Sequence, residues 1–335
     1  MALSSPCARV DGSGHMKWTR SRAVGFLALG AVVLALGAAT CGYQRDIQQA
    51  RSRIATGSQI AQTPCGPIEY AIAGDGPPLL IVHGAGGGFD QGLDFGLSLT
   101  GRGFRIIAMS RFGYLRTPLP ADASPAAQAD AHACLLDALG IERVAVAGAS
   151  AGAPSSVQFA LRHPERITSL VLLVPALYVP RPGGAASVTT PHGTSFLLNM
   201  GLRSDFLFWV ASRLARRTVL RAILATPPDL VDRSSPPEQA RVQEMLDRFL
   251  PIAPRRLGLI NEAAVIYTLP RYELERIAVP TLTIGVADDL FGTYDAARYT
   301  ADHIPGARFV GYPSGGHLWV GHHQDVIDEI AQFLR

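Results

Sequence analysis

The sequence predicts an α/β protein with a mostly parallel central sheet flanked by helices, a helical insertion and an N-terminal hydrophobic helix. Two observations support this prediction. Short, continuous apolar runs alternate with helical patterns, as expected of parallel strands buried on both faces. The alternation stops over about residues 179–275, where the patterns look helical. With 335 residues, of which 48% are hydrophobic and 17% charged, the chain suffices for one large domain with an insertion.

The N-terminal part differs in character from the rest. A basic segment, residues 1–22, precedes an uncharged apolar run at 23–42 that has the length and flanks of a short membrane span or a long signal peptide. Basic residues also follow this run and leave its orientation open. We expect the chain to contact the membrane here, and therefore to be membrane-anchored or exported to the cell envelope. A polar linker, either a helical or a flexible stalk, is expected at 43–60.

The body of the chain falls into three expected parts. The first part of an α/β core covers 61–178, the helical insertion covers 179–275, and the second part of the core covers 276–335. The strands that we expect in the core are the apolar runs at 65–74, 79–84, 104–110, 144–148, 170–174, 281–285 and 307–312. Helices are expected between them, for example at 153–163, which ends at a His-Pro pair. Apolar side chains of the insertion, such as Phe196 and Phe208, either line an acyl pocket or pack the insertion onto the core.

Several function classes are not supported by the composition. The net charge is +3, and the basic residues are spread along the chain, so no nucleic-acid partner is indicated. The four cysteines are far apart and form no CxxC pair, so neither a zinc site nor a disulfide framework is expected. The glycine run at 84–88 lacks the GK[ST] of a phosphate loop. No metal or organic cofactor is therefore expected.

One short segment carries the chemistry. Gly148-Ala149-Ser150-Ala151-Gly152 lies between an apolar strand and a helical pattern. A serine on a sharp strand-to-helix turn projects its hydroxyl above the sheet edge, and its neighbours must be small because the turn is tight. The N-terminus of the following helix favours negative charge that develops at the site.

Four motifs in this order resemble those of the α/β-hydrolase family, over about residues 61–335. They are the His-Gly-Ala-Gly-Gly-Gly run at 83–88, the serine segment at 148–152, Gly-Val-Ala-Asp at 285–288 and Gly-Gly-His at 315–317. Within the family the chain is similar to cap-bearing serine esterases and C–C bond hydrolases. A further segment, Ser-Arg-Phe-Gly-Tyr at 110–114, matches a family motif except that Ser110 replaces the usual Asp.

The resemblance implies a catalytic triad in the chain order nucleophile, acid, base. Ser150 is the candidate nucleophile, and His317, in a glycine-flanked loop, is the candidate base that a serine hydroxyl needs. The histidines at 322 and 323 are read instead as the start of the C-terminal helix. For the acid that fixes the tautomer of the base, the Gly-x-x-Asp spacing favours Asp288, with Asp289 as its rival.

The tetrahedral intermediate of acyl transfer carries an oxyanion that needs N–H donors. Ala151, directly after the nucleophile, is expected to supply one donor. Ala85 is expected to supply the other, with Gly86 as the alternative. His83 is interpreted as a hydrogen-bonding residue that shapes this loop.

The expected function is hydrolysis of a small, ester-like and apolar substrate through a Ser-His-Asp triad and an acyl-enzyme. A C–C bond hydrolase or an acyltransferase would use the same triad and stays open. From a different class, a catalytically silent binding module also stays open, because a fold does not determine a function. An intact triad with an intact oxyanion loop argues against the silent module.

Overall fold

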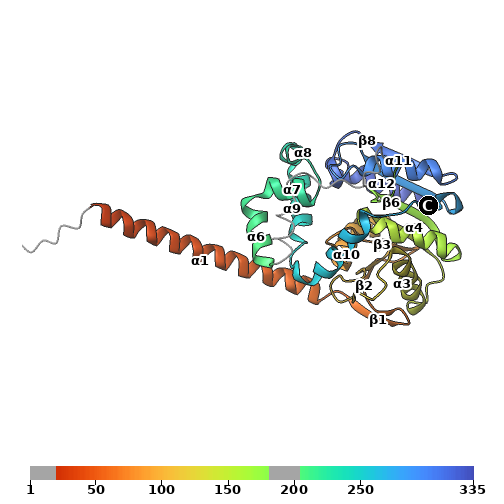
Figure 1. Ribbon diagram of the computed structural model, residues 1–335, viewed down its shortest axis with the longest axis horizontal. Coiled ribbons are helices and arrows are strands. Elements are labelled where there is room, and N and C mark those ends of the chain that lie inside the picture. The colour runs from red at the N-terminus through yellow and green to blue at the C-terminus, as the bar shows by residue number, and fades with distance from the viewer. Residues whose placement is uncertain (1–19, 181–203) are drawn as a thin grey trace, which may run out of the picture. The chain divides into compact units, whose positions relative to one another are not determined.

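The computed structural model describes residues 20–180 and 204–335 (Figure 1). It divides into two compact units, Met1–Asp46 and Ile47–Arg335. The first helix, α1 (Arg20–Ala55), spans this boundary, and every other element belongs to the second unit. Among the helices in the described ranges, none combines the length with the apolar character that crossing a membrane requires.

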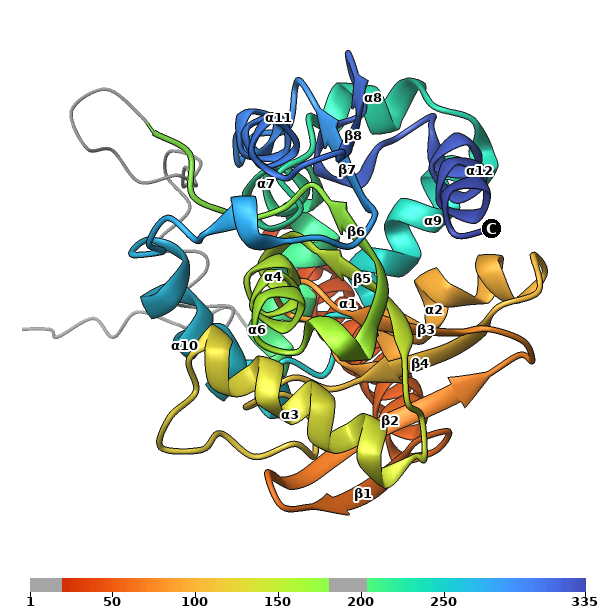
Figure 2. The same cartoon turned by 90° about the vertical axis from the view of Figure 1, so that its right-hand side faces the viewer.

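An eight-stranded sheet forms the centre of the second unit, in the order β1-β2-β4-β3-β5-β6-β7-β8 (Figure 2). The pairings of β2 with β1 and with β4 are antiparallel, and all others are parallel, so the mostly parallel sheet expected from the sequence is confirmed. The strands are β1 (Gln59–Thr63), β2 (Gly66–Ala73), β3 (Pro78–Val82), β4 (Arg105–Met109), β5 (Val144–Ala149), β6 (Ile167–Leu173), β7 (Thr281–Val286) and β8 (Arg308–Tyr312).

Helices cover both faces of this sheet. One apolar cluster joins one strand face to α3 (Pro125–Ala138), α4 (Ala153–Arg162) and α11 (Thr293–His303). A second cluster joins the opposite face to α2 (Phe89–Thr100) and α12 (His323–Phe333). Successive side chains of a strand point to opposite faces, so a strand covered on both sides must be apolar throughout. This explains the continuous apolar runs in the sequence.

In the part of the β6–β7 segment that the structure describes, five α-helices follow one another, and we call them the cap helices. They are α6 (Asp205–Leu214), α7 (Arg216–Ile223), α8 (Pro228–Arg233), α9 (Pro236–Asp247) and α10 (Arg256–Ile266). They fall within the helical insertion expected at 179–275, whose bounds stay a prediction. Phe196 lies outside the described residues.

The end of α1, from residue 47 on, belongs to the second unit and packs within it. Ile47 and Ala50 are buried. Arg53 pairs with Asp90 of α2, and its guanidinium donates a hydrogen bond to the carbonyl of Leu250 at 2.5 Å. The expected linker at 43–60 is therefore helical up to residue 55 and enters β1 at residue 59.

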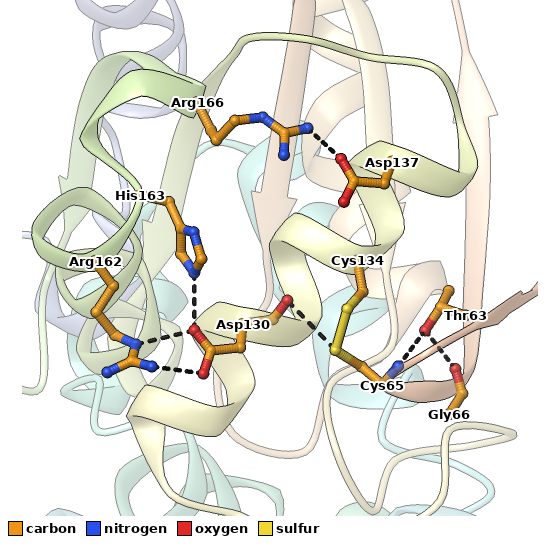
Figure 3. Close-up of a disulfide and its surroundings, with 9 residues drawn as sticks. All are labelled: Thr63, Cys65, Gly66, Asp130, Cys134, Asp137, Arg162, His163 and Arg166. Carbon is orange, nitrogen blue, oxygen red and sulfur yellow. Dashed lines mark hydrogen bonds and ion pairs between the residues drawn. A yellow bond between two sulfur atoms is a disulfide. The ribbon is translucent and has the colours of Figure 1, made fainter.

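A disulfide joins Cys65 to Cys134, with 6.1 Å between their Cα atoms (Figure 3). It ties the turn between β1 and β2 to α3. The sequence indicated no disulfide framework, and it did not point to this single bond. The two positions are 69 residues apart, and the sequence contains no signal that this turn packs against α3.

Candidate active site

Ser150 occupies a sharp turn between β5 and α4. Its φ of 49° lies in the left-handed region that non-glycine residues rarely adopt, as expected for a residue held in place by a functional turn. The flanking glycines are required by close contacts. A Cβ on Gly148 would lie 2.3 Å from Oγ of Ser156, and a Cβ on Gly152 would lie 2.4 Å from the carbonyl oxygen of Val82.

Two side chains from separate loops continue a hydrogen-bonded chain from Ser150. Nε2 of His317 lies 2.9 Å from Oγ of Ser150, and Nδ1 lies 2.8 Å from Oδ2 of Asp289. A carboxylate only accepts hydrogen bonds, so Nδ1 carries the proton and Nε2 is free to accept from the serine hydroxyl. Asp289 is itself fixed, because it accepts hydrogen bonds from the Phe291 N–H, at 2.9 Å, and from the Thr293 hydroxyl.

The structure brings Asp289 to His317, and Asp288, which the sequence favoured for this contact, is placed elsewhere. Oδ1 of Asp288 accepts a hydrogen bond from the N–H of Gly316 at 2.7 Å. The reason is the turn after β7, in which the N–H of Asp289 closes back onto the carbonyl of Val286. Asp289 is consequently buried, whereas Asp288 is partly exposed and braces the backbone of the histidine loop.

The neighbouring histidines take other partners. The ring of His322 stacks on Tyr312, and His323 lies next to the indole of Trp319. Their placement agrees with the interpretation that they begin the C-terminal helix.

The loop after β3 lies directly against the serine, since a Cβ on Gly84 would be 3.3 Å from the Cβ of Ser150. His83 shapes this loop. Its Nδ1 donates to the carbonyl of Gly84 at 2.7 Å, and its Nε2 accepts the N–H of Arg111 at 3.0 Å. Burial, together with the charge of Arg111, lowers the pKa of His83 well below its ordinary value, so the ring is neutral.

The two expected donors in this loop differ in their surroundings. The N–H of Gly86, the alternative donor, is directed to the hydroxyl of Tyr114 at 3.3 Å. This contact leaves the N–H of Ala85 as the better candidate in the loop. Ala151 follows Ser150 in the turn that leads into α4, as the sequence indicated.

Several polar residues to which the sequence analysis gave no role surround this loop. Arg111 donates to the carbonyls of Ala151 and Gly84, each at 3.1 Å, and pairs with Glu262 of α10. Arg255, which is fully buried, donates to the carbonyl of Gly87 at 2.5 Å and pairs with Asp90. The signal that could have found Glu262 is its position as the one acid in the apolar run of residues 257–267.

A cavity of about 470 Å³ lies between the cap helices and the core, with Ser150 and His317 in its wall. Its lining is mostly apolar. The cap helices contribute the side chains of Phe208, Ile223, Met245, Leu259, Ala263 and Ile266. No Lys or Arg belongs to the described lining, and its carboxylate, that of Glu262, is paired with Arg111. Sites of this size and character bind small, largely apolar molecules.

In the described part of the chain no three acidic, histidine or cysteine side chains are grouped so that they could hold a metal ion. The arrangement of Ser150 and its partners is that of a nucleophile with a positioned base.

A sequence model described as alpha/beta hydrolase fold matches residues 77–320. The chain belongs to the alpha/beta-hydrolase family. Its solved neighbours include an alpha/beta hydrolase fold protein from Nakamurella multipartita, which is 27% identical with a TM-score of 0.65 over 83% of this chain and 98% of that one. An enol-lactonase from Burkholderia xenovorans, 21% identical with a TM-score of 0.62 over 82% of this chain and 99% of that one, shares the fold.

Curated relatives of this alpha/beta hydrolase include other hydrolases. A 2-hydroxy-6-oxononadienedioate/2-hydroxy-6-oxononatrienedioate hydrolase of Paraburkholderia xenovorans is 35% identical over 80% of this chain and 90% of its own length. A hydrolase of Bacillus subtilis is 28% identical over 76% and 90% of the two chains. Together with the family match, these relatives show that the chain is a hydrolase.

Proposed function

We propose that this alpha/beta hydrolase is a serine hydrolase that cleaves an uncharged, mainly apolar carboxylic ester through an acyl-enzyme. One observation carries the proposal: the chain of hydrogen bonds from Ser150 through His317 to Asp289 opens into an apolar cavity. A serine with a positioned base beside an apolar pocket is suited to acyl transfer.

The geometry supports a two-step reaction. Nε2 of His317 takes the proton of Ser150 as Oγ attacks the ester carbonyl carbon, and Asp289 stabilises the imidazolium that forms. The N–H groups of Ala85 and Ala151 bind the tetrahedral oxyanion. The C–O bond to the alcohol then breaks, and His317 gives its proton to the leaving oxygen. In the second step His317 deprotonates a water as it attacks the carbonyl carbon of the acyl-enzyme. The C–Oγ bond then breaks, and His317 returns the proton to Oγ, which releases the acid and restores Ser150.

The charge of the cavity favours an ester over the C–C bond hydrolase alternative. The relative from Paraburkholderia xenovorans is named for a dioate, which carries two carboxylates. The described lining of this cavity offers no Lys or Arg side chain to a carboxylate, and it contains Glu262. Burying an unpaired charge is costly, so a neutral substrate fits better.

A fluorophosphonate probe tests the activated serine. We expect the full-length chain to be labelled at Ser150, as mapped by mass spectrometry, and labelling to disappear in Ser150→Ala. Ser156→Ala is the matched control, because Ser156 is a buried serine of α4 whose hydroxyl bonds to the carbonyl of Gly152. If the folded wild-type chain is not labelled and does not hydrolyse p-nitrophenyl esters, the silent binding module becomes the better reading.

A pair of esters tests the substrate class. We expect p-nitrophenyl hexanoate to be cleaved at least about tenfold more efficiently, in kcat/KM, than the p-nitrophenyl monoester of adipic acid. The two acyl chains differ mainly in a terminal carboxylate, and tenfold corresponds to about 1.4 kcal/mol. A preference for the charged ester would contradict the proposal of a neutral substrate. Product analysis with methanol present separates hydrolysis from acyl transfer to an alcohol.

A further inference from the structure

We infer that Glu262 of the cap is a positioning residue for the oxyanion loop, acting through Arg111 and Tyr114. The inference rests on the proposed function, because it concerns the proposed oxyanion donor Ala85. It assigns to the cap a part in the chemical step, in addition to its part in forming the cavity wall.

The first contact concerns the peptide group that joins Gly84 to Ala85. The carbonyl oxygen of Gly84 accepts hydrogen bonds from the guanidinium of Arg111 at 3.1 Å and from Nδ1 of His83 at 2.7 Å. A trans peptide is planar, so fixing the direction of its C=O also fixes the opposite direction of its N–H. That N–H belongs to Ala85. The charged guanidinium of Arg111 on the carbonyl also polarises the peptide and strengthens its N–H as a donor.

The second contact lies on the other side of Ala85. The N–H of Gly86 donates to the hydroxyl of Tyr114, which in turn donates to Oε2 of Glu262 at 2.5 Å. Burial and the nearby Glu262 charge raise the pKa of Tyr114 well above its ordinary value, so the phenol keeps the proton that it donates. The groups next to Ala85 are therefore held on both sides.

Glu262 is the point at which the two contacts meet. Its Oε1 pairs with Arg111 and its Oε2 binds Tyr114, and all three side chains are buried. Arg111 and Tyr114 hydrogen-bond to the loop, and the hydrogen bonds of Glu262 go to these two side chains, so Glu262 is linked to the peptide of Ala85 through them. Removing its charge would leave the guanidinium of Arg111 without its ion-pair partner in a buried site.

Backbone hydrogen bonds hold α10 in the position from which Glu262 reaches its two partners. The N–H of Gly258 donates to the carbonyl of Gly113 at 2.9 Å, and the N–H of Leu115 donates to the carbonyl of Pro254 at 2.8 Å. A Cβ on Gly258 would lie 2.2 Å from Cε2 of Tyr114, so only glycine lets the helix approach the phenol this closely.

Glu262→Gln tests the inference, because it keeps the size of the side chain and removes its charge. Loss of a whole oxyanion donor costs about 10²- to 10³-fold in kcat, so a misaligned donor is expected to cost about 10- to 100-fold. KM for p-nitrophenyl hexanoate should stay within about twofold. The inhibition constant of a trifluoromethyl ketone, whose adduct places an oxyanion in this site, should rise by about the same factor as kcat/KM falls.

Glu69→Gln is the matched control. Glu69 is a fully buried carboxylate that also holds an arginine and a hydroxyl, those of Arg116 and Ser110, but it has no hydrogen bond to residues 84–87. We expect the kcat of Glu69→Gln to stay within about threefold of the wild-type kcat. Glu69→Gln and Glu262→Gln are each assayed at the same number of degrees below their own Tm.

Tyr114→Phe is a second and milder variant, which removes only the hydroxyl. We expect a several-fold loss of kcat, and the double variant with Glu262→Gln should lose less than the product of the two single losses. A wild-type kcat and ketone affinity in Glu262→Gln, or a rise in KM alone, would overturn the inference. A wild-type chain without labelling at Ser150 and without hydrolysis would instead overturn the proposed function.

Discussion

At the scale of single residues, the two neighbouring aspartates are expected to act differently. Asp289 bonds to Nδ1 of His317, whereas Asp288 bonds to the backbone of Gly316. Asp289→Asn would favour the wrong tautomer of His317, so we expect kcat to fall by about 10³- to 10⁴-fold. Asp288→Asn should cost less than about tenfold, because its amide oxygen still accepts the same N–H. Steady-state rates on one ester decide between them. A greater loss in Asp288→Asn would return Asp288 to the role that the sequence suggested.

A second residue-scale prediction concerns acid stability. Burial lowers the pKa of His132 to about 3, so the ring is neutral in the folded protein, whereas in the unfolded chain it titrates near 6.5. The unfolded state then binds more protons below pH 6.5. Above this pH the titration of His132 does not lower the free energy of unfolding. As the pH falls from 6.5 toward 3, the free energy of unfolding decreases, and the loss is about 2 kcal/mol at pH 5. Urea unfolding of wild type and His132→Gln between pH 8 and 5 measures this slope. Equal slopes in the two proteins would contradict it.

At the scale of elements, the disulfide is expected to stabilise the attachment of the β1–β2 turn to α3 (Figure 3). Because the bond restricts the unfolded chain, replacing Cys65 and Cys134 by alanine should lower the free energy of unfolding by about 2–4 kcal/mol. The activity should persist, since neither residue lines the cavity. Cys41→Ala, at an exposed free cysteine, is the control. An unchanged urea midpoint when wild type is reduced would contradict this prediction.

The elements also show which parts of the fold and of the candidate site could be predicted from the sequence. The parallel strands, the serine turn and the histidine loop were predictable because local signals mark them: apolar runs, and glycines where the backbone is crowded. The sequence could not decide between Asp288 and Asp289, because the direction of each side chain depends on the hydrogen bonding of the turn after β7. The disulfide and the role inferred for Glu262 depend on contacts between segments that are 69 and about 150 residues apart, and such contacts leave no local pattern.

At the scale of the whole molecule, the cap and the core both contribute residues to one candidate site. The core supplies the serine, the histidine and the oxyanion loop at the carboxyl ends of its strands, where α/β proteins place their sites. The cap helices supply the apolar wall and Glu262. The apolar wall of the cap therefore bears on substrate preference, whereas Glu262 links α10 to the geometry of the oxyanion loop.

The last prediction concerns where the protein works. We predict that the catalytic unit lies outside the cytoplasm, attached to the membrane or exported. The apolar run at 23–42 follows basic residues, and the bond between Cys65 and Cys134 is of a kind that persists in oxidising compartments. After fractionation of cells that express the full-length chain, we expect it in the envelope or exported fraction, with both cysteines protected from alkylation until a reductant is added. A variant without residues 1–42 should stay in the cytosol and have both thiols alkylated. Finding the full-length chain in the soluble cytosolic fraction with free thiols at 65 and 134 would contradict the prediction.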